Sequence, residues 1–170
     1  MSIPVILDTD IGTDVDDVWA LAFLLRCPEL DIRLITTATG DTRHRAALVA
    51  KILSIAGRDD VPIGVGLPLD PAPLGHVAWL GGYRLEDYPG PVYEDGVGAI
   101  CDSVMDSEES VTIIAIGPVP NIAAALVREP QLTERSSFVG MHGSLRRGYL
   151  GAPKAMREYL SLIHISEPTR

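Results

Sequence analysis

The chain has 170 residues, 46% of them hydrophobic, which predicts one folded domain with an apolar core rather than a disordered chain. Its net charge of −9 argues against nucleic acid as a partner, because binding to phosphates depends on Lys and Arg. No apolar run reaches the roughly 20 residues of a bilayer span and no basic signal segment begins the chain, so we expect a cytoplasmic protein with no membrane partner.

Short apolar runs alternate with segments of helical periodicity along the chain. In chain order, strands are predicted at 3–8, 31–40, 61–67, 111–117 and 136–143. Helices are predicted at 16–25, 42–56, 97–105 and 118–130, and a stretch rich in Pro and Gly occupies 68–91. This alternation predicts an α/β fold with a mostly parallel, doubly wound (Rossmann-like) sheet and helices on both faces.

Polar motifs follow the carboxyl ends of these strands, where parallel α/β sheets bind their ligands. The first motif, DTDIGTDVDD at 8–17, contains five aspartates: Asp8, Asp10, Asp14, Asp16 and Asp17. Their mutual repulsion calls for a positive charge among them, and oxygen-only ligands favour Ca²⁺ or Mg²⁺ over Zn²⁺. Capping the following helix needs one aspartate, not five. An EF-hand is excluded because the loop lacks a Glu at its twelfth position.

This motif resembles the N-terminal signature DxDxGxDD of the inosine-uridine preferring nucleoside hydrolase family, with two extra residues before the last aspartate pair. The segments ITTATGDTRHRA, IAIGPVPNIAAAL and VGMHGSLRRGY also resemble family motifs, so that the similarity covers about residues 3–159. The resemblance implies a nucleoside-hydrolase-like fold. It also implies hydrolysis of the N-glycosidic bond of purine or pyrimidine ribonucleosides, small molecules that serve nucleoside salvage.

The resemblance further implies a calcium site. The ion would be bound by Asp10, Asp17 and the backbone carbonyl of Ile116, and Asp8 would support the site or contact the ion. Asp10 would also be the catalytic general base that accepts a proton from the attacking water. Asn121, in the GPVPN segment, is expected to fasten its loop by hydrogen bonds to backbone.

Three residues would bind the substrate. Asp16 and Asp41 would hold the ribose hydroxyls, and Glu158 would contact the far end of the ribose. Family members are roughly twice as long and carry a further metal-ligating aspartate in their second half, so we expect an incomplete fold, impaired activity of this chain, and a homo-oligomer at full length. Residues 160–170 match nothing in the family and are predicted to be a non-native tail after an N-terminal part at 1–159.

Two alternatives stay open. A haloacid-dehalogenase-like, Mg²⁺-dependent phosphatase would use Asp8 as nucleophile and Asp10 as acid. That class expects Thr or Val where this chain has Gly12, and it does not predict Asp16 and Asp17. The other alternative is a non-catalytic calcium-binding or interaction fragment, which would keep the aspartate loop without turnover.

Overall fold

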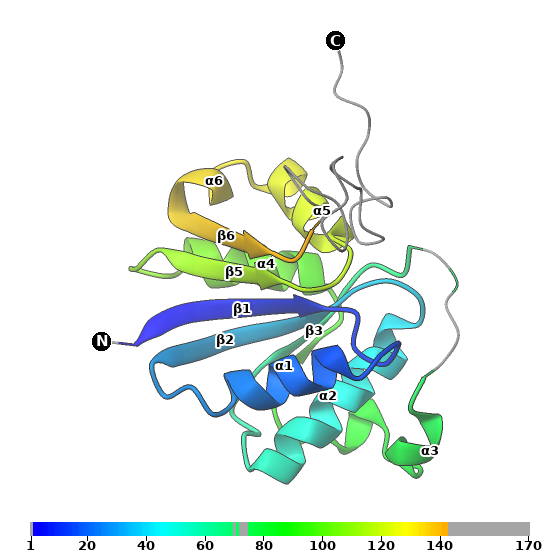
Figure 1. The fold of residues 1–170 in the computed structure, drawn as a ribbon. Helices are drawn as coiled ribbons and strands as arrows, with labels where there is room; N and C mark the ends of the chain where they lie inside the picture. Colours follow the sequence, from blue (N-terminus) through cyan, green and yellow to red (C-terminus); the bar gives the residue numbers. More distant parts are fainter. Residues whose placement is uncertain (1, 70, 72–74, 143–170) are drawn as a thin grey trace, which may run out of the picture.

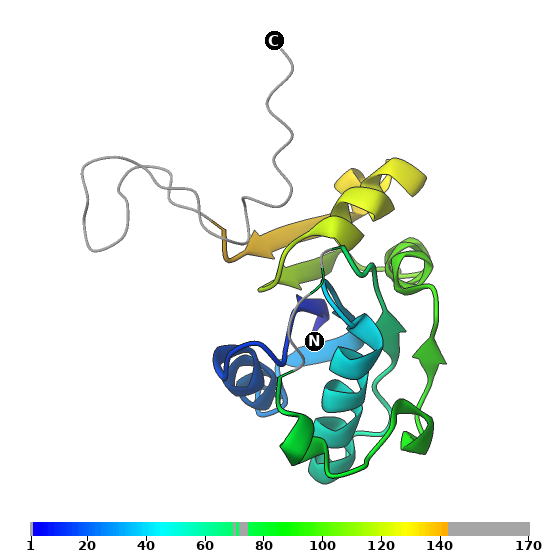
Figure 2. The same ribbon diagram turned by 90° about the vertical axis from the view of Figure 1, so that its right-hand side faces the viewer.

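A computed structural model describes residues 2–69, 71 and 75–142, whose strands form one six-stranded sheet with helices on both faces (Figures 1 and 2). The strands are β1 (Ile3–Thr9), β2 (Leu30–Thr37), β3 (Ile63–Val65), β4 (Val92–Tyr93), β5 (Val111–Ala115) and β6 (Ser136–Gly140). Their order is β4-β3-β2-β1-β5-β6, and every pairing is parallel. The predicted α/β fold with a parallel sheet is confirmed.

The helices connect the strands along the chain. They are α1 (Asp16–Leu24), α2 (Thr42–Ala56), α3 (Val77–Leu80), the 3₁₀ helix η1 (Leu85–Asp87), α4 (Gly96–Met105), α5 (Pro120–Arg128) and α6 (Leu132–Arg135). A proline begins α5, where its missing N–H costs no helical hydrogen bond. Among the residues placed in the structure, no helix is long and apolar enough to cross a membrane.

β1 lies inside the sheet, and its alternate side chains enter two separate cores. Val5 and Leu7 pack with α1 and α2 on one face, whereas Ile6 packs with α4 and α5 on the other (Figure 1). Burying an aliphatic side chain of this size contributes about 1.5–3 kcal/mol. These two cores hold the end of β1, and therefore the start of the aspartate motif, in a fixed position.

Several boundaries differ from the predicted ones. β2 ends at Thr37 rather than at residue 40, because Thr39 and Gly40 have φ angles of 68° and 63°, which no strand can contain. The stretch 68–91 includes α3 and η1 and leads into β4. β4 was not predicted, because two residues are too few to show the alternation that predicts a strand.

β6 forms one edge of the described sheet, and side chains on both of its faces are exposed. Phe138 is 50% exposed and the neighbouring Val139 is 57% exposed. On α1, Trp19 and Phe23 are each 73% exposed, one helical turn apart. The chain therefore presents apolar surface both along its open sheet edge and on the outer side of its first helix.

Candidate active site

The aspartate motif lies where the segment after β5 meets the end of β1. The backbone N–H of Ile116 donates to the carbonyl oxygen of Asp8 at 2.9 Å. A Cβ atom on Gly117 would lie 2.6 Å from the backbone nitrogen of Asp10, so a larger residue there would push the two segments apart. The structure thus brings the predicted residues Asp8, Asp10 and Ile116 together at the carboxyl ends of β1 and β5.

The motif continues as the turn between β1 and α1, which we call the Asp loop (residues 10–15). α1 begins at Asp16, which is exposed, and the next residue, Asp17, is buried and accepts a hydrogen bond from the hydroxyl of Thr9. The helix N-terminus favours negative charge at this point. Val15 occupies the N-cap position and no described side chain caps the helix, so capping does not explain the loop aspartates.

Three carboxyl groups of the motif are buried: Asp8 is 0%, Asp10 8% and Asp17 7% exposed. Burial raises the pKa of Asp8 to about 7 and that of Asp17 to about 7, and it also raises the pKa of Asp10, because a charged group loses its hydration. Oδ2 of Asp8 is buried and has no hydrogen-bond partner among the described residues. Groups in this environment take up a proton unless a cation lies near them.

The donor atoms fit a hard cation. They are carboxylate and carbonyl oxygens, which Ca²⁺ prefers. Within residues 2–69, 71 and 75–142, no three His, Cys, Asp or Glu side chains form a metal-binding group. The ligand set implied by the family needs only Asp10, Asp17 and the Ile116 carbonyl from this part of the chain, so it does not require such a group. Calcium at this position stays a prediction.

A buried arginine that the sequence analysis did not identify lies beneath the Asp loop. Arg45, in α2, is only 4% exposed. Its guanidinium donates hydrogen bonds to four loop residues: to the carbonyl oxygens of Asp10, Ile11 (2.7 Å) and Thr39 (2.7 Å), and to the hydroxyl of Thr13 (3.1 Å). Its charge opposes the rise in pKa that burial causes at Asp10. The available signal was a charged residue on the apolar stripe of a predicted helix, shared with Leu48 and Val49.

Asn121, in the first turn of α5, links the ends of β1 and β2 to the segment after β3 and is fully buried. Its Nδ2 donates to Oδ1 of Asp8 at 2.8 Å and to the carbonyl oxygen of Thr37 at 3.0 Å. Its Oδ1 accepts from the backbone N–H of Leu67 at 2.8 Å. The predicted hydrogen bonds to backbone are confirmed. The additional bond to Asp8 connects Asn121 directly to the carboxylate motif.

Replacing Asn121 with Ala is expected to lower the free energy of unfolding by about 2 kcal/mol, because it removes its hydrogen bonds to the buried Thr37 carbonyl, to the Asp8 carboxylate and to the Leu67 amide. Urea unfolding measures the change. Thr133→Ala is the control, since its exposed hydroxyl donates to the Pro130 carbonyl, and it should change stability by less than about 0.5 kcal/mol. Equal effects of the two substitutions would contradict the structural role of Asn121.

The predicted substrate-binding residues that the structure describes, Asp16 and Asp41, lie at the same end of the sheet as the Asp loop. Asp41 is the N-cap of α2, and its Oδ1 accepts from the backbone N–H of His44 at 2.9 Å. Asp41 and Asp16 are both exposed, so a ligand can reach them. Glu158 and the predicted boundary at 159/160 lie outside the described residues.

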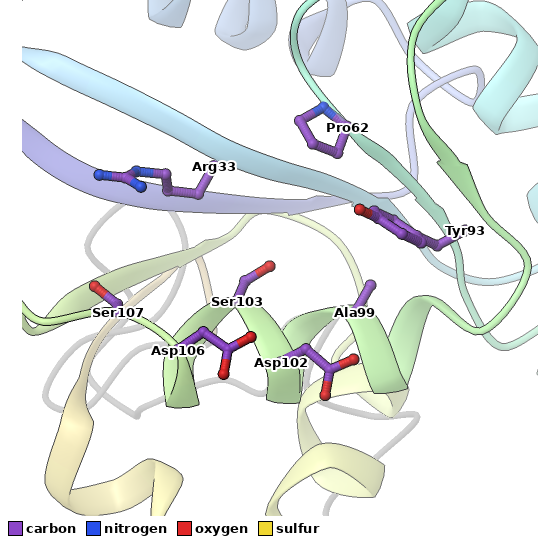
Figure 3. Close-up of a pocket in the computed structure, with 8 residues that line it drawn as sticks. All are labelled: Arg33, Pro62, Tyr93, Ala99, Asp102, Ser103, Asp106 and Ser107. Atoms are coloured by element: carbon purple, nitrogen blue, oxygen red, sulfur yellow. The ribbon is translucent and has the colours of Figure 1, made fainter.

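A surface pocket of about 400 Å³ lies elsewhere, between α4 and residues of β2, β4 and the segment just before β3 (Figure 3). Arg33 and Pro62 line it from the sheet side, Asp102 lines it from α4, and Asp106 lines it from the position just after this helix. None of the predicted site residues lines this pocket. Because ligands of parallel sheets bind at the carboxyl ends of the strands, the Asp loop and not this pocket is the candidate active site.

The parallel sheet and the buried carboxylates at the end of its first strand are features of an α/β protein whose candidate site lies at the carboxyl ends of the strands. The profile of the inosine-uridine preferring nucleoside hydrolase family matches residues 5–158. The chain belongs to this family. The haloacid-dehalogenase-like alternative is therefore not supported.

Known proteins agree with this assignment. The chain is 35% identical over 158 residues to the non-specific ribonucleoside hydrolase RihC of Klebsiella pneumoniae, a match that covers 87% of this chain and 51% of that protein. Among solved structures, a plant nucleoside hydrolase matches with a TM-score of 0.70 and 27% identity, over 92% of this chain and 53% of the other. The purine-preferring ribonucleoside hydrolase of Gardnerella vaginalis matches with a TM-score of 0.68 and 26% identity, over 88% and 52%. The chain spans about half the length of the curated relatives it matches.

Proposed function

We propose that this chain supplies the Asp-loop half of a calcium-dependent hydrolase that cleaves the N-glycosidic bond of ribonucleosides to give base and ribose. The observation that carries the proposal is that the buried Asp10 carboxylate lies against the segment after β5, at the carboxyl ends of the strands. Family membership supports the reaction, and the names of the relatives support nucleosides as the substrate class.

The roles of the residues follow from their chemistry. Calcium, held by Asp10, Asp17 and the Ile116 carbonyl, would lower the pKa of the attacking water and help to orient the ribose diol. Asp10 accepts the proton of this water. Asp16 and Asp41 hold the ribose hydroxyls, and the carboxylates stabilise the positive charge that develops on the sugar in the oxocarbenium-like transition state.

The proposal is tested with the chain extended to the length of its relatives, which we call the extended protein. Inosine and uridine are incubated with it in calcium or in EGTA, and release of the base is measured by chromatography. We expect hydrolysis of both nucleosides in calcium and little in EGTA. Nucleoside turnover at the same rate in EGTA would contradict the metal requirement.

Two further results would contradict the proposal and favour one of the alternative functions. Hydrolysis of p-nitrophenyl phosphate in Mg²⁺ without nucleoside hydrolysis would indicate a phosphatase. Calcium binding without turnover of any nucleoside would favour the non-catalytic calcium-binding alternative. Nucleoside salvage in the cytoplasm and homo-oligomeric assembly stay predictions, and chromatography with light scattering tests the assembly.

A further inference from the structure

The guanidinium of Arg45 connects two loops that follow different strands. On one side it bonds to the carbonyl oxygen of Ile11 at 2.7 Å and to that of Asp10, both after β1. On the other side its Nε donates to the carbonyl oxygen of Thr39 at 2.7 Å, after β2. A planar guanidinium has five N–H donors in a rigid fork, so one side chain can hold acceptors from both loops in a fixed relative geometry.

The Asp loop also rests directly on the helix that carries this arginine. Gly12 has a φ angle of 106°, which L side chains rarely adopt. A Cβ atom on Gly12 would lie 2.6 Å from Cδ1 of Leu48 and 3.7 Å from Nη1 of Arg45. The loop therefore follows the surface formed by these two α2 side chains, and its path depends on them.

These contacts use the backbone carbonyls of the loop and leave its carboxylates for other partners. The carbonyl oxygens of Asp10 and Ile11 accept from Arg45, so they are oriented toward α2. Thr39 is held by the same side chain, two residues before Asp41. The arginine thus connects the backbone of the predicted general base to the turn that leads into Asp41, a residue predicted to bind the ribose.

We propose that Arg45 is a positioning residue that holds the Asp loop and the Thr39–Asp41 turn in the geometry required for cation and sugar binding. That a cation and a sugar bind here rests on the proposed function, whereas the positioning of the two loops by Arg45 does not. A residue that only supported the core would not couple these two loops. The matched control is Arg43→Ala on the same helix, because Arg43 is exposed and pairs with Glu86 and Glu94.

A positive charge beside a cation site has two opposite effects, which makes the proposal testable. By repulsion alone, removing the charge would strengthen calcium binding. By positioning, removing the fork would weaken it, as loss of a residue that orients metal ligands commonly costs 10–100-fold in affinity. Arg45→Met removes charge and fork together, and Arg45→Lys removes only the fork.

The experiment compares both Arg45 variants with the Arg43→Ala control in the extended protein. Calcium affinity is measured by isothermal titration, and kcat and KM are measured with inosine. Both Arg45 variants should bind calcium at least about tenfold more weakly and show a raised KM for inosine, with the control unchanged. Tighter calcium binding by Arg45→Met, or full recovery in Arg45→Lys, would overturn the positioning role.

Amide hydrogen exchange gives a readout that needs neither calcium nor substrate. We expect faster exchange at residues 11–13 and 39–41 in both Arg45 variants, with β5 unaffected. If the wild type binds no calcium, the proposed calcium site is excluded. The exchange comparison still tests whether Arg45 positions the two loops. If both variants unfold, Thr13→Val removes only the bonds of Arg45 to the Thr13 hydroxyl. Unchanged exchange in the loops of a folded variant would refute the proposal.

Discussion

Replacing Asp10 with Ala in the extended protein is expected to reduce kcat for p-nitrophenyl riboside about 10³-fold. General-base catalysis contributes about 10²–10⁴-fold, and the same carboxylate is also a proposed calcium ligand. Asp10 is only 8% exposed and lies against Gly117, whereas Asp14 and Asp16 of the same motif are exposed. Steady-state release of p-nitrophenolate measures the effect.

The control for Asp10 is Asp102→Asn, at an exposed position on α4 in the pocket of Figure 3. This variant should keep wild-type kcat, because the pocket lies away from the Asp loop. Circular dichroism shows whether Asp10→Ala remains folded. Wild-type turnover in a folded Asp10→Ala protein would exclude Asp10 as the general base, and a large loss in Asp102→Asn would move the site to the pocket.

Without calcium, the contribution of Asp8 and Asp17 to the free energy of unfolding is expected to fall by about 5 kcal/mol between pH 5 and pH 8. Burial raises the pKa of Asp8 and Asp17 to about 7 in the folded state, from 3.8 when they are exposed. The folded state therefore binds these protons more tightly than the unfolded state. Their contribution to stability is complete below about pH 4 and is lost as the pH rises through 7. Urea unfolding in EGTA at several pH values measures this loss.

Asp8→Asn should weaken this pH dependence, because one of the buried carboxyl groups with a raised pKa is gone while Asp10 and Asp17 remain. Asp60 and Glu86 do not affect the same pH window, because their Arg partners lower their pKa values and they titrate below pH 5. Saturating calcium should restore stability at pH 8. Stability that is constant from pH 5 to 8 in EGTA would contradict the raised pKa values.

Most of the fold could be predicted from the sequence because its strands are buried and its helices amphipathic. Runs such as VTIIAIG at 111–117 predict internal strands by composition alone, and β5 is found there. The order of the strands across the sheet was not predicted, since it depends on contacts between distant segments. β4 could not be found either, because a two-residue strand is defined by its pairing with β3 and not by a local pattern.

The site could be predicted only in part. The aspartates of 8–17 are visible because five like charges in ten residues need an explanation. Their burial could not be predicted, and it is burial that separates Asp10 and Asp17 from the exposed Asp14 and Asp16. Arg45 was missed because most of its hydrogen bonds go to backbone carbonyls of distant loops, which no residue type predicts, although its place on the apolar stripe of its helix was visible.

The bond between Asn121 and Asp8 also has a consequence for biosynthesis. The two residues are 113 positions apart. At a translation rate of about 5–20 residues per second, roughly 6 to 23 s separate their synthesis on the ribosome. During most of this interval β1 can pair with β2 but β5 has not yet been made, and throughout it the Asp8 carboxylate has no Asn121 to bond. The ligand-binding end of the sheet therefore matures late, after most of this part of the chain has been made.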